Sequence, residues 1–333
     1  MEHKLSSAQM QKFIAVVNEV ERYRDLSEKE KEGIVLSIIG RPYMDLRSDW
    51  AFKHVLQDKE ILMMLLNDFL PEEIESVELQ PNEIDRLRPD DKNVIMDVLC
   101  RTVDGRKFIV EMQRKKKRSF QRRMLYYGAS MLHQQLKPNQ SYSALRPVYV
   151  ICFMDFKLPH ETDQLVYRYS LCEQESGERY ENLLSIYLCE LPRLKATSIE
   201  GLDPVRSWFY ILENMRIFAG KPEEMGKRYA AVAEAARMYT LPDEQMIQYL
   251  RNMITEEERL DMGGAYYDDG FADGKQAGLE EGRKEGIEKG REEGREEERM
   301  AIAEKLRGMG MPLESIAQAT GLSVEDLKGM SAK

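Results

Sequence analysis

"NVIMDVLCRTVDGRKFIVEMQ", residues 93–113, contains two apolar runs separated by a turn sequence. The runs at 93–101 and 107–112 are rich in Val and Ile and flank Thr-Val-Asp-Gly, which is the pattern of a β-hairpin. Each run carries one acid, Asp97 or Glu111, on the same strand face as apolar neighbours. A lone carboxylate on such a face is costly to bury. The presence of two acids in this hairpin therefore needs an explanation.

The length of the hairpin loop decides whether the two acids meet. A two-residue loop would make them face opposite sides of the sheet. A three-residue loop, residues 103–105, pairs Thr102 with Arg106, and Asp97 then lies directly opposite Glu111. Glycine at the third position favours this loop, because that position needs a positive φ. We predict this register, with the Cβ atoms of the two acids about 4.5–5.5 Å apart.

Two carboxylates opposite each other repel, so the pair needs a shared proton or a divalent cation. Oxygen ligands without His or Cys favour Mg²⁺ or Mn²⁺, and Mg²⁺ commonly binds one or two carboxylates together with phosphate oxygens. Seven cations and no anion follow Gln113. They are Arg114, Lys115, Lys116, Lys117, Arg118, Arg122 and Arg123. This pattern predicts metal-assisted hydrolysis of a phosphodiester, although an ordinary solvated hairpin with one Asp and one Glu remains an alternative.

Composition limits the class of protein. The 333 residues carry a net charge of −10, which argues against a general nucleic-acid coat protein. The four cysteines are far apart and form no CxxC, so neither a zinc site nor a disulfide framework is expected. No apolar run reaches the roughly 18 residues of a membrane span, and the first residues resemble no signal peptide. We expect a cytoplasmic protein without membrane contact.

Hydrophobic periodicity predicts the other elements of the chain. Helices are expected at 7–39, divided near Ser27, at 49–69, at 119–136 and throughout 204–260; further strands are expected at 146–153, 164–171 and 182–191. The run at 146–153 is continuously apolar, as in a strand that is buried on both faces.

The C-terminal part changes in composition. Glycine recurs every four residues from 270 to 294, with Glu, Lys and Arg between, which fits either a flexible charged spacer or a self-association helix. Residues 300–333 predict three short helices in a helix-turn-helix-like arrangement. The third, at 324–328, is acidic, so packing or assembly is favoured over DNA reading.

Four sequence blocks together resemble a known family. They are "SDWAFKHVL" (48–56), "DVLCRTVDGRKFIVEMQ" (97–113), "RRMLYYGASMLHQQL" (122–136) and "LRPVYVICFMDF" (145–156). In this order they resemble the Rpn family of recombination-promoting nucleases, also labelled transposases, within the PD-(D/E)XK nuclease superfamily. The resemblance extends over about residues 41–300 and includes the glycine repeat.

The resemblance implies a restriction-endonuclease-like α/β core, a central mixed sheet flanked by helices, with an α-helical C-terminal region. It implies that Asp97 and Glu111 bind the metal, that Asp49 is the first acidic position, and that Gln113 replaces the usual Lys. Lys53, Arg123 and Tyr126 match family blocks and are expected to contact DNA, together with the other cations of the run. Met124 and Tyr127 are expected to face the core.

We thus expect a prokaryotic Mg-dependent DNA endonuclease, connected with recombination, mobile elements or defence. The alternative is a catalytically weak or inactive nuclease-fold protein that binds DNA or assembles. Five parts are expected: a helical extension at 1–40, the nuclease domain at 41–200, a helical region at 201–262, the glycine repeat at 263–299 and the tail at 300–333. If the glycine repeat is a self-association helix rather than a spacer, homo-oligomers are expected to form through 263–299.

Overall fold

The computed structural model forms two compact units, residues 1–265 and 266–333. It describes residues 5–84, 94–117, 119–261, 283, 290–291, 294–295 and 298–329. Within these ranges no helix has the length and apolar character needed to cross a membrane.

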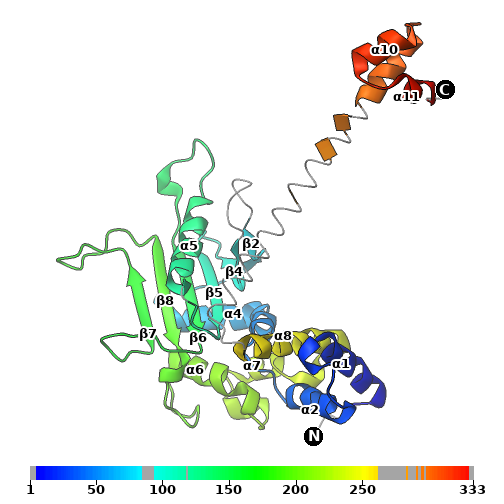
Figure 1. Ribbon diagram of the computed structural model, residues 1–333. Helices are drawn as coiled ribbons and strands as arrows, with labels where there is room; N and C mark the ends of the chain where they lie inside the picture. The colour runs from blue at the N-terminus through cyan, green and yellow to red at the C-terminus, as the bar shows by residue number, and fades with distance from the viewer. Residues whose placement is uncertain are drawn as a thin grey trace. The chain divides into compact units, whose positions relative to one another are not determined.

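A six-stranded mixed sheet is the centre of the first unit (Figure 1). In sheet order its strands are β1 (Glu78–Gln80), β4 (Val98–Arg101), β5 (Lys107–Gln113), β6 (Val148–Met154), β8 (Leu184–Glu190) and β7 (Val166–Ser170). β5, β6 and β8 run parallel, and the other neighbours are antiparallel. Every residue of β6 is buried, as its continuous apolar sequence predicts. The expected strands at 146–153, 164–171 and 182–191 are therefore confirmed as β6, β7 and β8.

The hairpin between β4 and β5 has the predicted register. Val98 lies opposite Val110, and the Thr102 N–H donates to the carbonyl of Arg106 at 3.0 Å. Gly105 has a φ of +90°, so the third loop position takes the backbone conformation that favours glycine. The three-residue loop is confirmed.

The expected strand at 93–101 is wrong in one respect, because it breaks before Asp97. Its first part, β3 (Val94–Ile95), pairs with β2 (Glu83–Ile84) in a separate two-stranded sheet. The second part is β4, which enters the main sheet. The break separates Ile95, whose side chain is exposed, from the buried β4.

Helices cover both faces of the main sheet (Figure 1). One face packs against α3 (Asp49–Leu56), α4 (Lys59–Phe69) and α6 (Pro204–Asn214), and the other packs against α5 (Phe120–His133). The continuous helix expected at 49–69 is wrong: Asp58 accepts hydrogen bonds from the backbone of Glu60 and Ile61 and so begins a new helix. The helix expected at 119–136 is confirmed as α5. This arrangement is the expected α/β core with a mixed sheet flanked by helices.

The N-terminal helices share the core of the first unit. α1 (Ser7–Glu19) and α2 (Glu28–Ile39) pack together and against α8 (Asp243–Asp261). Ser27 begins α2 through a capping box with Glu30, as its position in the sequence predicts. The boundaries expected at 40, 200 and 262 stay predictions. The remaining short helices are α7 (Ala230–Ala235), η1 (Glu21–Tyr23), η2 (Tyr142–Ala144), η3 (Leu191–Arg193), η4 (Met215–Ile217), η5 (Pro222–Met225) and η6 (Met238–Thr240).

The second unit contains a small helical cluster. Residues 298–308 are helical and precede α10 (Leu313–Thr320) and α11 (Val324–Gly329). Ala303, Ile316 and Leu327 are buried against one another. The three short helices are confirmed, whereas the helix-turn-helix role stays a prediction. In the repeat, Gly290 and Gly294 are helical with open space beside them, and the other glycines lie outside the described residues.

Candidate active site

Asp97, the residue before β4, lies beside Glu111 of β5. The Asp97 N–H donates to Oε1 of Glu111 at 3.0 Å, and the Met112 N–H donates to Oδ2 of Asp97 at 2.8 Å. Each carboxylate is thus held by the backbone of the opposite strand. The Asp97 side chain is 11% exposed, and Glu111 is 2% exposed. The predicted apposition of the two acids is present, in a nearly closed site.

The pKa values of both acids are raised. Burial, and then the charge of Glu111, raises the pKa of Asp97 well above its ordinary value. Burial also raises the pKa of Glu111 to about 7, although the positive charge of Arg123 opposes this shift. Near neutral pH the pair therefore favours either a retained proton or a bound cation.

The donor set fits a hard divalent cation. Paired carboxylate oxygens are ligands that Mg²⁺ and Mn²⁺ prefer, and the repulsion between the acids is what such a cation relieves. No group of three or more His, Cys, Asp or Glu side chains suited to a metal is present in the described ranges. A cation bound by Asp97 and Glu111 would need water or substrate oxygens as its other ligands.

Lys53 connects the pair to α3. Its ammonium lies 2.8 Å from Oδ1 of Asp49, one helical turn earlier, and 3.2 Å from Oδ1 of Asp97. Burial lowers the pKa of Lys53, but the charges of Asp97 and Asp49 outweigh burial and raise it. The structure thus brings Asp49, Lys53, Asp97 and Glu111 together, with a protonated amine among three acids.

Gln113 lies between Glu111 and Arg123. Its amide Nε2 donates to Oε2 of Glu111 at 3.3 Å, and the guanidinium of Arg123 donates to its Oε1. The Arg123 guanidinium also lies over the ring of Tyr127, 5.9 Å from the centroid. Arg123 therefore orients the residue that stands where the motif usually has Lys.

Tyr127 lies beside the acids rather than only in the core. Its hydroxyl donates to the carbonyl of Ile95 at 3.2 Å, and burial raises its pKa to about 12. The expectation that Tyr127 faces the core is confirmed, and the structure adds that its hydroxyl reaches the strand that leads to Asp97. The spacing to Arg123 could have indicated this, because residues four apart share one helix face.

The cation run does not join the carboxylates as one group. Arg114 forms ion pairs with Glu256 at 2.7 Å and Asp45 at 3.7 Å, so it faces the protein interior. The others of the run that are described lie around the start of α5. Lys116, Arg122 and Tyr126 are exposed, Lys115 and Lys117 are half-buried, and Arg118 lies outside the described residues.

Glu256 of α8 is a further residue of the site, which the sequence did not indicate. Its Oε1 accepts from the N–H of Asp49 at 2.9 Å, and its Oε2 accepts from Nη1 of Arg114 at 2.7 Å. It thus joins the start of α3 to the residue after β5. Nothing in the local pattern distinguishes Glu256 from its acidic neighbours in "TEEER".

The chain was also compared with known proteins. A family model described as PD-(D/E)XK nuclease family transposase matches residues 46–261. The matched range contains every residue of the carboxylate cluster and Glu256. No curated protein matches the chain, and no solved structure does.

Proposed function

The chain belongs to the PD-(D/E)XK nuclease family transposases, and from this premise we propose that it is a metal-dependent DNA endonuclease that hydrolyses phosphodiester bonds. The observation that carries the proposal is the buried pair of Asp97 and Glu111 beside the ammonium of Lys53. A role in recombination, mobile elements or defence, in a prokaryotic cytoplasm, belongs to the same proposal.

Asp97 and Glu111 would hold Mg²⁺ or Mn²⁺, with Asp49 next to them. When bound, the cation supplies a water of lowered pKa and neutralises the charge that develops on the phosphate. Burial of the two acids excludes bulk water from this point, which strengthens the electrostatic interactions in the site.

Lys53 would supply the positive charge that Gln113 does not carry. Its ammonium is 3.2 Å from Asp97, so it can donate a hydrogen bond to a phosphate oxygen or to the attacking water at this position. Gln113, oriented by Arg123, would donate its amide to the same oxygens. Lys53 and Gln113 would thus together take the role of the lysine that the motif usually has at position 113.

The DNA backbone would lie along the start of α5. Lys116, Arg122 and Tyr126 are exposed there, next to Lys115, Lys117 and Arg123. The positive charge of the lysines and arginines is complementary to phosphates. Arg118 belongs to the proposed surface by its sequence position. Arg114 is better assigned to holding the site together, because binding DNA would break its ion pairs with Glu256 and Asp45.

The test is nicking of supercoiled plasmid with and without Mg²⁺. Wild type should nick in Mg²⁺ and not in EDTA, and Asp97→Asn should reduce the rate by about 100-fold or more, because it removes a ligand charge. The control is Asp163→Asn. The side chain of Asp163 is 87% exposed and forms its ion pair with Arg193, outside the candidate site. Circular dichroism checks that both variants fold.

Two results would contradict the endonuclease proposal: equal nicking by wild type and Asp97→Asn, or no nicking by wild type. In the second case, DNA binding that does not depend on Mg²⁺ would favour the alternative, an inactive nuclease-fold protein. The uncharged Gln113 at the position of the usual motif lysine is the observation that favours this alternative.

A further inference from the structure

β7 is a free edge of the main sheet. Among the strands of the described residues it pairs with β8 alone, and the Glu190 N–H donates to the carbonyl of Leu165. In an antiparallel pair this pattern alternates, so Arg168 and Ser170 direct their N–H and C=O groups away from β8. Edge strands are usually protected by proline, charged side chains or a bulge; β7 has no proline, and Arg168 is its one charged side chain.

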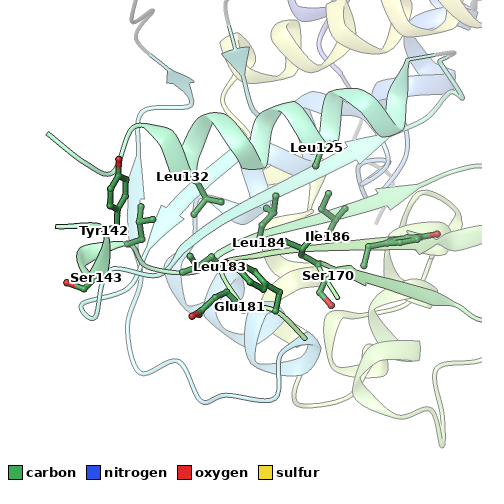
Figure 2. A pocket seen from close by; sticks show the side chains of 13 residues that line it. Leu125, Leu132, Tyr142, Ser143, Ser170, Glu181, Leu183, Leu184 and Ile186 are labelled. Carbon is green, nitrogen blue, oxygen red and sulfur yellow. The ribbon is translucent and has the colours of Figure 1, made fainter. Parts of the chain in front are cut away.

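An apolar groove lies next to this edge, between α5 and the β7–β8 pair (Figure 2). Its cavity volume is about 810 Å³. Leu125 and Leu132 of α5 lie over Leu184 and Ile186 of β8, and Tyr169 of β7 also lines the groove. Within the described ranges, α5 is the helix on this side of the sheet, and it leaves the groove beside β7 open.

The exposed aromatic surface around the groove is as large as a binding patch. Tyr142, Tyr169 and Tyr180 line it and are 82%, 43% and 76% exposed. At about 200 Å² for each ring, they present on the order of 400 Å². An exposed patch of this size usually binds something. A stable dimer buries roughly 800 Å² on each partner, so the three tyrosines could supply about half of that area.

Charge and geometry indicate which partner fits. Glu181 is the charged side chain among the lining residues, and the lining has no cation, so a phosphate backbone is disfavoured. A strand edge can be satisfied by another strand, and an identical edge related by a two-fold axis is self-complementary.

We propose that β7 pairs antiparallel with β7 of a second copy of this chain, so that the two sheets join into one. Tyr169 lies opposite Tyr169 of the partner subunit, and Arg168 lies opposite Ser170 of the partner subunit. This register joins the outward N–H and C=O groups and keeps like charges apart. It also places the aromatic pair on the groove side, since Tyr167 packs against the α5 core.

The dimer has a consequence for the candidate active sites. The two-fold axis runs perpendicular to the joined sheet, so the α5 face of both copies points to the same side. Glu111 lies on that face, because Ile109, two residues earlier, packs in the α5 core. The Glu111 side chains of both copies would therefore lie on one side of the joined sheet, and the dimer does not depend on catalysis.

Sedimentation velocity of the full chain tests the dimer. Wild type should sediment as a dimer at micromolar concentration, and Tyr169→Lys should be monomeric, because it places two lysines opposite each other. Ile217→Lys is the control, since Ile217 is 72% exposed and belongs to η4. A monomeric wild type, or a Tyr169→Lys variant that folds by circular dichroism and remains a dimer, would overturn the proposal.

Disulfide trapping tests the register. Cys172 is the exposed cysteine, so the experiment uses a Cys172→Ser background. Tyr169→Cys should form a disulfide-linked dimer on mild oxidation, because cross-strand Cβ atoms in a non-hydrogen-bonded pair are close enough. Arg168→Cys should not, since position 168 lies opposite Ser170 of the partner subunit and is too far from position 168 of the other copy for a disulfide. Cross-linking of both variants to the same extent, or of Arg168→Cys alone, would contradict the proposed pairing.

Discussion

Lys53 has the most specific role that a single residue takes in the site. It lies between Asp49 and Asp97, and its charge lowers the pKa that burial and Glu111 raise at Asp97. The structure thus gives a position, next to the pair of Asp97 and Glu111, to a residue for which the sequence indicated only DNA contact.

Replacing Lys53 by Met should reduce DNA nicking by about 100-fold, because it removes a positioned cation from a site with little water. Adding Gln113→Lys to this variant should restore part of the activity, since it returns an amine to the motif position. Lys59→Met on the exposed side of α4 is the control. Full activity of Lys53→Met would show that the ammonium is not needed.

The raised pKa of Glu111 predicts an unusual dependence of the free energy of unfolding on pH in the absence of metal. Its pKa in the folded state is about 7, against 4.5 in the unfolded chain, so the folded state holds the proton more tightly. Stability should therefore decrease as pH rises from about 4.5 to 7, by up to about 3 kcal/mol. Urea unfolding in EDTA at pH 5 and pH 7.5 measures this difference.

Glu111→Gln should lose part of this pH dependence, because the amide does not titrate, whereas the buried Asp97 keeps a raised pKa and contributes the rest. Mg²⁺ should stabilise wild type at pH 7.5 more than at pH 5, since it binds the ionised pair. A wild type that becomes more stable over the same pH range in EDTA would contradict the assignment of a raised pKa to Glu111.

At the scale of elements, α8 determines how α3 meets the end of β5. Glu256 accepts one hydrogen bond from the start of α3 and one from Arg114. These two contacts keep the helix that carries Asp49 and Lys53 against the strand that carries Glu111. Glu256 is thus a positioning residue, because these two hydrogen bonds go to Asp49 and Arg114 and not to Asp97 or Glu111.

Glu256→Gln should lower kcat for nicking by about 10- to 100-fold and leave the KM for DNA nearly unchanged. The amide keeps the shape of the side chain but loses the charge that pairs with Arg114. Its neighbour Glu257→Gln is the matched control on the same helix. Equal kcat values for the two variants, or a change confined to KM, would contradict a positioning role.

At the scale of the whole molecule, the first unit is wider than the matched family range. The match covers residues 46–261, whereas α1 and α2 precede it and still pack against α8. Phe13 and Val17 are fully buried in the core that also contains Ile254 of α8. The N-terminal helices therefore support the helix that carries Glu256, which connects the start of the chain to the candidate site.

The sequence by itself determined the features that depend on neighbouring residues. The loop around Gly105 fixes the register that brings Asp97 opposite Glu111, because its hydrogen bonds are local. Ser27 begins α2 and the apolar run of β6 is buried for the same kind of reason. The breaks at Asp97 and Asp58 were missed, since hydrophobic periodicity continues through both.

Only the tertiary structure decided which distant side chains meet. Lys53 reaches Asp97, Glu256 reaches Asp49, and Arg114 turns away from the surface because α3 and α8 pack together beside the end of β5. Such contacts depend on the relative placement of packed helices and strands, and a pattern within one segment contains no information on that placement. The free edge of β7 likewise exists only once the order of the strands is known.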